Sequence, residues 1–388
     1  MTATLSKNDT PESTPRVYPV PSTPAPEASG LTAEQVEELG RRLDAIRDRI
    51  LAERGATDAA YIRRVIKTQR ALEIGGRALL FAGVLPPAWI AGTALLSVAK
   101  ILENMEIGHN VLHGQWDWMR DPKIHSSNWE WDLVSDAQGW KHSHNYVHHT
   151  YTNVVGKDRD VGYGILRLSE EQPWRPYYLG NPVYNVLLSM FFEWGVALHD
   201  LEYEKVISGE KTKGEVWAQL KRIGRKVGRQ FTKDYLVFPA LAGPFFLPVL
   251  LGNATANLVR NVWSHAVIFC GHFPDGTVQF TEEQLEGETR GQWYLRQMLG
   301  SANLDGSPFF HLMTGNLSFQ IEHHLFPDLP SNRYAEIATE VRALCAEYGL
   351  PYTTGRLPTQ YLQVVRKLVR LALPPKHVRP ADLALVEG

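Results

Sequence analysis

Residues 78–113, ALLFAGVLPPAWIAGTALLSVAKILENMEIGHNVLH, combine an apolar run with a pair of histidines, and this combination decides the fold. No charged residue occurs in 78–99, and Pro86 and Pro87 interrupt the run. Because proline breaks the backbone hydrogen bonding of a helix interior, the pair indicates either a kinked span or a tight hairpin of two helices. The second helix would then end on the two histidines.

Several other segments of the chain are similarly apolar. A helix that crosses a bilayer needs about 20 apolar residues, so each segment is borderline by itself. Together they are difficult to place in the core of a soluble protein. We therefore expect an all-α integral membrane protein with four transmembrane helices in two hairpins. The expected segments are about 72–86, 88–112, 182–199, and 235–251 and/or 254–271.

The charge pattern indicates how these helices are oriented. Between Lys205 and Lys233, nine Lys and Arg residues stand against two acids, immediately before an apolar segment. Positive charges close to a span remain in the cytoplasm. We therefore expect a multi-pass protein of the cytoplasmic membrane, with a helical cap and its functional site on the cytoplasmic side. Apolar residues from Trp217 to Val227 recur on one face, so this stretch either lies flat on anionic headgroups or is a solvated basic helix.

Composition sets further limits on domain organisation and function. The 40 Lys and Arg residues against 42 Asp and Glu argue against a nucleic-acid binder. Two cysteines exclude a disulfide scaffold and a multi-cysteine metal site. Residues 1–30 are rich in proline and are expected to be disordered, 31–375 to form the main domain, and 376–388 to form a tail. Thr32 and Gln35 form a capping box that predicts a helix start.

The chain contains 14 histidines, and half of them fall in three clusters. Two of the clusters contain a histidine pair at spacing i, i+4, which places two imidazoles on one helix face. The third contains two adjacent histidines. The clusters are His109-Asn-Val-Leu-His113, His144-Asn-Tyr-Val-His148-His149, and Gln320-Ile-Glu-His323-His324.

Seven clustered imidazoles indicate a metal site. Without metal, each unpaired ring nitrogen would cost about 1–3 kcal/mol on burial. One zinc ion takes at most four ligands, so seven imidazoles suit two metals. Imidazole binds iron, copper and zinc alike, so the ligand type alone does not decide the metal. Two redox-active metals at a membrane surface suggest oxygen activation, which favours iron.

The three clusters, their order and the hydrophobic layout resemble the membrane fatty acid desaturases, most closely the actinobacterial acyl-CoA desaturases of the stearoyl-CoA type. The most specific stretch is GNLSFQIEHHLFPDLPSNR at 315–333. The resemblance covers about residues 35–375. The other stretches that carry it are 103–118, 145–153 and 269–276.

The resemblance implies that the cap carries a di-iron site made by these histidine boxes. The family also takes one ligand from the last membrane helix, for which His272 is our choice and His265 the competitor. These two are seven residues apart and share a helix face, so the sequence cannot separate them. The implied box ligands are His109, His113, His144, His148, His149, His323 and His324.

Four further residues are candidates for metal binding or for orienting the ligands. Gln320 stands where many relatives have histidine, a pattern that resembles the front-end desaturases. Asn261 matches an asparagine that binds a metal through water in the wider family. Asp160, more than Asp158, could orient imidazole N–H groups. His265 remains an alternative ligand.

The implied reaction is the introduction of a cis double bond, most simply at Δ9 of stearoyl- or palmitoyl-CoA, with O₂ and two electrons. The electrons would derive from NAD(P)H through a separate reductase, with or without a ferredoxin or cytochrome b5-like carrier, because no His-Pro-Gly-Gly haem motif is present. An acyl-lipid or front-end (linoleoyl-CoA-like) desaturase and a fatty-acyl hydroxylase are alternatives. The sequence assigns no substrate-binding residue.

Two function classes outside the desaturases were also considered. A membrane metal transporter would place its ligands inside the bilayer, facing one another across helices. Two of the three clusters lie outside the apolar segments, which disfavours transport. A zinc hydrolase would need a glutamate base within His-Glu-x-x-His, and no such pattern occurs.

Overall fold

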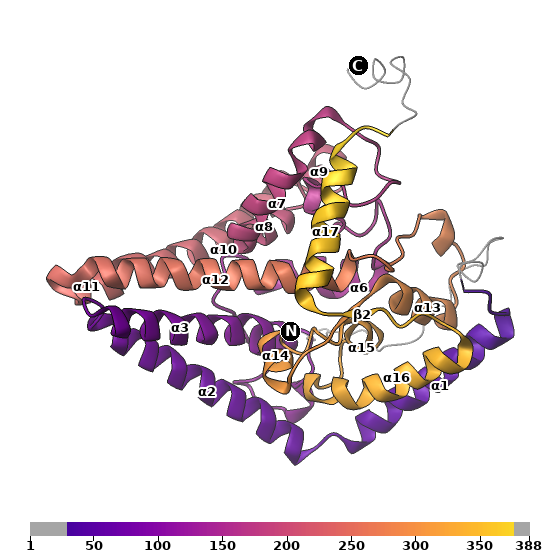
Figure 1. Cartoon of the computed structure of the whole chain (residues 1–388), viewed down its shortest axis with the longest axis horizontal. Helices are drawn as coiled ribbons and strands as arrows, with labels where there is room; N and C mark the ends of the chain where they lie inside the picture. The colour runs from indigo at the N-terminus through magenta and orange to yellow at the C-terminus, as the bar shows by residue number, and fades with distance from the viewer. Residues whose placement is uncertain (1–28, 376–388) are drawn as a thin grey trace, which may run out of the picture.

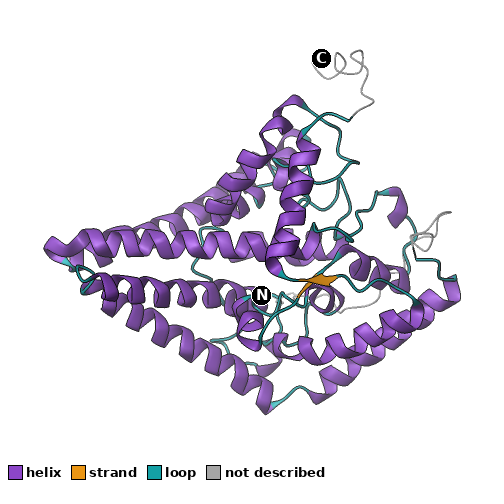
Figure 2. Cartoon of the chain, viewed as in Figure 1, coloured by secondary structure: helices purple, strands orange, loops and turns teal. Residues whose placement is uncertain are grey.

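The computed structural model describes residues 29–375, which are mostly helical, as predicted (Figures 1 and 2). The only strands in this part of the chain are β1 (Asn303–Leu304) and β2 (Thr354–Gly355), which pair in parallel. The predictions for residues 1–28 and for the tail 376–388 lie outside the described residues.

The first helix, α1 (Ala33–Glu53), begins where the sequence predicts. Thr32 and Gln35 form the capping box, since each side chain accepts a hydrogen bond from the backbone of the other. The apolar stripe of α1 packs against α13 (Arg290–Gly300). The two helices cross so closely that a Cβ atom on Gly40 would lie 2.9 Å from the backbone of α13.

The two prolines start a new helix, so the hairpin alternative is correct. The helix α2 (Ala56–Phe81) is joined by a short turn to α3 (Pro86–Leu102). A Cβ atom on Gly76 would lie 2.8 Å from the backbone nitrogen of Leu96, so glycine is needed for this close packing. The expected segment 72–86 therefore covers the end of α2 and the turn that follows it, since α2 continues without a break through residue 72.

The long helix α12 (Phe246–His272) lies along α3 and contains the whole of the predicted segment 254–271. In Figure 1, α2, α3 and α12 converge on the turns at 82–85 and 242–245, which we call the narrow end. The first turns of α3 and α12 are in contact there, since the indole nitrogen of Trp89 donates a hydrogen bond of 2.9 Å to the carbonyl of Pro248.

Two predicted segments do not form single helices. Residues 182–199 form α7 (Asn181–Met190) and α8 (Phe192–His199), which are separated where Phe191 leaves the helical conformation. Residues 235–251 cross the turn at the narrow end, so their first part belongs to an earlier helix. No helix between residues 29 and 375 is both long and apolar enough to meet the criterion for a membrane span, and the four predicted spans are therefore not confirmed.

The helix that contains the first part of residues 235–251 begins within the basic stretch between Lys205 and Lys233. Its first part, α10, has a Thr212–Glu215 capping box, and it continues through a π-helical segment into α11 at the narrow end. The three parts are Lys213–Phe231, Thr232–Val237 and Phe238–Leu241.

The cap lies at the opposite end of the molecule, where a core of apolar side chains joins α1 to three later helices. These helices are α13, α15 (Gln320–Leu325) and α16 (Tyr334–Tyr348), whereas α14 (Pro308–Met313) packs against α3.

The last helix, α17 (Leu357–Ala372), packs against α12 and α7.

Short helical elements complete the cap and hold the histidine boxes. Two are π-helical segments, a form that is frequent at functional sites, and they replace the regular α-helical turns expected from the sequence. They are Glu103–His109 and Lys141–His148. The short α-helices are α4 (Asn110–Leu112), α5 (Ala137–Trp140), α6 (His149–Tyr151) and α9 (Tyr203–Ile207). The 3₁₀ segments are Asp117–Met119, Gly162–Gly164, Pro176–Gly180, Gly243–Phe245, Glu283–Leu285 and Ser331–Arg333.

Candidate metal centre

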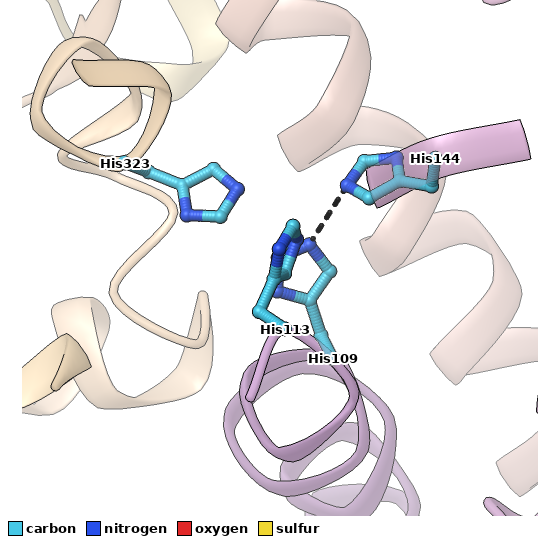
Figure 3. Close-up of side chains that lie close together, drawn as sticks. All are labelled: His109, His113, His144 and His323. Carbon is cyan, nitrogen blue, oxygen red and sulfur yellow. Dashed lines mark hydrogen bonds between the residues drawn. The ribbon is translucent and has the colours of Figure 1, made fainter. Parts of the chain in front are cut away.

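Four imidazoles from all three boxes meet in what we call the first cluster: His109, His113, His144 and His323. One nitrogen from each ring lies within 4.8 Å of one nitrogen from each of the others. Figure 3 shows His109 and His113 rising from one helix, with His144 and His323 approaching from opposite sides. The Nε2 atoms of His109 and His144 are 3.2 Å apart.

Three imidazoles form a second cluster: His148, His272 and His324. The Nε2 atoms of His272 and His324 are also 3.2 Å apart. Two nitrogens that each lie about 2.1 Å from one metal ion at neighbouring ligand positions have a separation of this size. The second cluster therefore has the spacing of a ligand set.

His149 lies between the two clusters. Its ring centroid is 4.7 Å from that of His113 in the first cluster and 4.5 Å from that of His324 in the second. Both of its ring nitrogens are buried, and neither has a hydrogen-bond partner in the part of the chain that the structure describes.

Neighbouring side chains determine which ring nitrogen is free to bind. The Nδ1 atom of His148 lies 3.0 Å from both carboxylate oxygens of Asp158, which can only accept a hydrogen bond. That nitrogen therefore carries a proton, which leaves Nε2 as the nitrogen of His148 that can bind a metal. The equivalent pairs are His109 with Asn110 Oδ1, His323 with the Tyr334 hydroxyl, and His324 with Gln297 Oε1.

The free nitrogens are buried without partners. Nε2 of His113, His148 and His323 makes no hydrogen bond to any described residue. Burial and the neighbouring imidazoles hold the pKa of His113, His149, His323 and His324 well below the usual value, so these rings are neutral. Neutral imidazoles with free lone pairs that converge from several helices fit bound metal ions.

Charge near His148 differs from that around the other rings. Burial alone would lower its pKa, but the carboxylates of Asp158 and Asp160 outweigh this effect and raise the pKa to about 9. These carboxylates would also offset the positive charge of a metal bound at Nε2 of His148.

A pocket with a mainly apolar surface opens onto both clusters. Its wall includes His109 and His144 of the first cluster and His148 and His272 of the second. Its other lining residues include the apolar and aromatic side chains of Met105, Trp131, Leu133, Trp140, Tyr163, Phe192 and Ile268. Polar side chains also line it, namely Asn104, Ser143, Asp160, Glu193, His199, Asp200, Asn261 and Gln320.

The chain matches the family described as fatty acid desaturase over residues 85–356, which is more than half of its length. It belongs to the fatty acid desaturase family. This desaturase is 53% identical over 353 residues to a protein of Mycobacterium tuberculosis named NADPH-dependent stearoyl-CoA 9-desaturase. That match covers 90% of this chain and 83% of the relative.

More distant relatives are also desaturases. The chain is 26% identical over 281 residues to the sn-1 linoleoyl-lipid 6-desaturase of Synechocystis, with 71% of this chain and 77% of the relative covered. It is 26% identical over 357 residues to human fatty acid desaturase 3, with 87% and 73% covered. The resemblance drawn from the histidine boxes is therefore confirmed.

The structure separates His272 from its competitor in this desaturase. His272, at the end of α12, lies in the second cluster, whereas His265 stacks on Phe269 with ring centroids 3.9 Å apart. His265 also contacts Phe192 and Tyr361 and belongs to neither cluster.

The other candidates take different positions. Gln320 lies beside the second cluster, with its Nε2 atom 3.0 Å from Nε2 of His272 and its Oε1 atom buried without a described partner. Asp160 forms a possible ligand group with His144 and His148. Asn261 lines the pocket, where its amide donates to the carbonyl of Met190 and its Oδ1 atom accepts a hydrogen bond from Arg260.

Several residues that support the site were missed or given too little weight. Asp158 was ranked below Asp160, yet it is the carboxylate in direct contact with His148. Tyr334 directly follows the third-box stretch, which is a signal that could have identified it. Gln297 is distant in sequence and carries no such signal. His199 belongs to none of the three boxes and is buried, with its Nε2 atom 3.3 Å from Asp160.

Buried carboxylates hold the boxes together. Glu106 accepts hydrogen bonds from the hydroxyls of Tyr61 and Ser331 and from the amide of Asn316, at 2.7–2.9 Å. It thereby joins the helix of the first box to the loops around the third. Glu322 has the same kind of environment, since it accepts from Asn303 and Tyr352.

Proposed function

We propose that this desaturase introduces a cis double bond at Δ9 of stearoyl- or palmitoyl-CoA, using O₂ and two electrons that derive from NADPH or NADH. The observation that carries the proposal is that both imidazole clusters line one apolar pocket. The name of the relative that is 53% identical supports the acyl-CoA substrate and the Δ9 position.

Two iron ions are the proposed cofactors. The first cluster would hold one and the second cluster the other, with His149 between them as a ligand. Iron supplies the oxidant that an unactivated C–H bond requires, which side-chain acid–base chemistry cannot provide. Asp158, Tyr334 and Gln297 hold the Nδ1 protons, and this keeps each Nε2 atom directed at its cluster.

Gln320 would complete the second cluster. Exchange of its two amide atoms, which a half-turn of the side-chain amide achieves, brings the oxygen to the position beside His272 and His324. An amide oxygen is a weaker donor than imidazole, so this ligand would be the weakest of the set.

The pocket contributes positioning and the exclusion of water. Its apolar wall would hold a saturated chain in a fixed path, so that one carbon pair lies beside both clusters. The same wall keeps water away from the reacting carbons.

A charged pocket adjoins the apolar pocket and shares Trp131 and Leu133 with it. We infer that it receives the CoA headgroup, because its cations can bind phosphate. Arg229 makes no ion pair with any described residue and is therefore available for this role. The other cations of the wall, each paired with an acidic side chain, are Arg70, Lys100, Lys226 and Lys233. The wall also contains the carboxylates of Glu73, Glu103, Glu130 and Asp132.

Large apolar side chains are exposed in continuous regions, which supports association with a membrane. We propose that the narrow end enters the bilayer and that α7 and α8 lie at its surface, with the cap in the cytoplasm. The cations of α10, which precede the narrow end, favour this orientation. The exposed residues include Val84, Leu85, Ile90, Val183, Val186, Phe191, Trp194, Leu241, Phe245, Phe246 and Leu247.

Electrons would come from a separate NAD(P)H-dependent reductase, with or without a carrier protein, that docks on the cytoplasmic face. The name of the relative states dependence on NADPH, which supports this source.

The test is expression in a host that lacks its own Δ9 desaturase, together with a reductase, followed by mass spectrometry of the fatty acids. We expect new Δ9 monoenes of 16 and 18 carbons, and none from the matched variant His323→Ala. A double bond at another position would favour the front-end alternative, and a hydroxylated product would favour a hydroxylase. Unchanged fatty acids with reductase present would contradict the proposal.

A further inference from the structure

Gln115 follows the first histidine box and is fully buried. The helix of that box ends at Gly114, whose φ of +78° lies in the left-handed region that glycine adopts readily. The backbone N–H of Gln115 then returns to the carbonyl of Asn110, with a distance of 3.4 Å, in a bond typical of Schellman helix ends. This turn places Gln115 beside Asn110.

The side-chain amide of Gln115 contacts two groups that orient imidazoles of the first cluster. Its Nε2 atom lies 3.3 Å from Oδ1 of Asn110 and 2.9 Å from the hydroxyl of Tyr334. The same Oδ1 atom of Asn110 lies 3.1 Å from Nδ1 of His109. The hydroxyl of Tyr334 lies 3.2 Å from Nδ1 of His323. Gln115 therefore connects a histidine of the first box to a histidine of the third.

The backbone after the third box fixes the orientation of this amide. Nε2 of Gln115 lies 3.1 Å from the carbonyl of Pro327, which can only accept a hydrogen bond. Oε1 of Gln115 lies 2.9 Å from the N–H of Ser331, which can only donate. A half-turn of the amide would lose both bonds. The two Nε2 hydrogens are therefore shared among Pro327, Tyr334 and Asn110.

The hydrogen bonds of Asn110 determine which nitrogen of His109 is protonated. Nδ2 of Asn110 donates to the backbone carbonyls of Glu106 and Gly315, at 3.0 and 3.1 Å. Both of its hydrogens are thus used, and Oδ1 accepts from Nδ1 of His109 and from Gln115. Nδ1 of His109 therefore carries a proton, which leaves Nε2 as the nitrogen that can bind a metal.

The hydroxyl of Tyr334 has the same effect on His323. It has one hydrogen and two lone pairs. The hydrogen goes to the carbonyl of Phe326, 3.1 Å away, and one lone pair accepts from Gln115. The other lone pair faces Nδ1 of His323, which must then donate. Without Gln115, the hydroxyl is free to turn its hydrogen toward His323, which would move the proton of that ring to the buried Nε2 atom.

We propose that Gln115 is a positioning residue that keeps the metal-binding nitrogens of His109 and His323 free at the same time. This inference rests on the proposed function, because it requires an iron ion at the first cluster. Among the described residues, no hydrogen bond joins Gln115 to a histidine of the second cluster or to a group that orients one. The effect is therefore confined to the first cluster.

The test compares full-length Gln115→Leu with the unmodified enzyme, both loaded with iron, during titration with a chelator. Leucine has a similar size but donates no hydrogen bond. One of the two irons should be released about 10–100-fold faster, as is typical for groups that orient metal ligands. The other should be released at the original rate. Because the clusters differ in their ligands, Mössbauer spectra distinguish the two irons, and only the signal of the first cluster should change.

A double variant tests whether Gln115 acts through Tyr334. Tyr334→Phe removes the hydroxyl that faces His323 and should also speed release of the first iron. When two residues belong to one network of contacts, their effects are not additive. The combined Gln115→Leu and Tyr334→Phe variant should therefore release this iron more slowly than the product of the two single effects. A full product would show that the two residues act independently and would contradict the proposed role.

Gln360→Leu is the matched control. Gln360 is also buried, and its amide donates to the carbonyl of Asn303 at 3.0 Å, a contact that includes no group that orients an imidazole. This variant should leave the release of both irons unchanged. If Gln115→Leu does not fold, Gln115→Met keeps the length of the side chain without the amide and tests the same loss.

Equal acceleration of both irons, the same acceleration in Gln360→Leu, or unchanged release in the Gln115 variants would overturn this inference and leave the proposed function intact. An unmodified enzyme that holds no iron after loading with iron(II) would instead overturn the proposed function.

Discussion

The first and second clusters differ in the number of imidazoles and in their surroundings. The first contains four imidazoles, whereas the second contains three. Next to the second cluster lie Gln320, where many relatives carry histidine, and the carboxylates Asp158 and Asp160. This difference indicates that metal binding at the second cluster depends more strongly on groups other than imidazole.

The clusters also differ in how the chain assembles them. Two histidines of the first cluster, His109 and His113, come from one short stretch of chain. The second cluster takes one histidine from each of three distant elements: a π-helical segment, α12 and α15. Its geometry therefore depends more on the packing of the whole cap.

The largest expected effects come from removing one imidazole from either cluster. His323→Ala in the first cluster and His148→Ala in the second should each abolish product and lower the iron content, because each leaves its metal short of a ligand. Product analysis and elemental analysis of purified protein measure the two effects. The variants should still be recovered with the membrane fraction, and turnover by either would show that the ligand assignment is wrong.

Asp158→Asn should have the next largest effect, a loss of about 10–100-fold in iron affinity or activity, as is typical for groups that orient metal ligands. Asparagine keeps the shape but removes the charge that faces Nδ1 of His148. Iron retention during titration with a chelator measures the change. Asp121→Asn is the matched control, since Asp121 is a surface carboxylate paired with Arg63, and an equal loss in both variants would count against the role of Asp158.

Gln320 tests the difference between the clusters directly. Gln320→His would give the second cluster a fourth imidazole and should slow the release of iron to a chelator. Gln320→Ala should speed the release of iron by about 10-fold, which is the smallest effect typical of groups that support metal ligands. Identical release rates in the two variants would show that Gln320 makes no contribution to metal binding.

Of these variants, His265→Phe should change iron content and product formation least. His265 is buried among aromatic rings with both ring nitrogens unpaired by any described residue. Phenylalanine has a ring of similar size without the two unpaired nitrogens. We therefore expect the free energy of unfolding to be unchanged or raised by about 1 kcal/mol. Iron content and product should stay near those of the unmodified enzyme, and a clear loss of iron would return His265 to the list of ligands.

The position of the last ligand shows where sequence reasoning reaches its limit. His265 and His272 are seven residues apart, which places them on nearly the same face of α12 but about 10 Å apart along its axis. The spacing predicts the shared face. Which of the two reaches the second cluster depends on how far α12 extends beside α15, and a sequence pattern does not contain that information.

The interrupted helix at 182–199 illustrates the same limit. Its residues are apolar enough to suggest one span, but the chain turns at Phe191, and α7 and α8 lie against α12 and α17. The average apolar character of a segment does not reveal such a turn, because tertiary packing overrides the local pattern. The π-helical form of two histidine boxes escaped prediction for the same reason.

The sequence by itself determined that the chain is helical, that its histidines form three boxes suited to two metals, and that it is a fatty acid desaturase. These conclusions depend on residue types at short spacings, which local helix geometry converts directly into shared faces. Only the tertiary structure decided which histidines share a cluster, that His272 and not His265 joins them, and that Asp158, Gln297 and Tyr334 orient the rings. Those contacts join segments far apart in the chain, and their distances depend on the packing of whole helices.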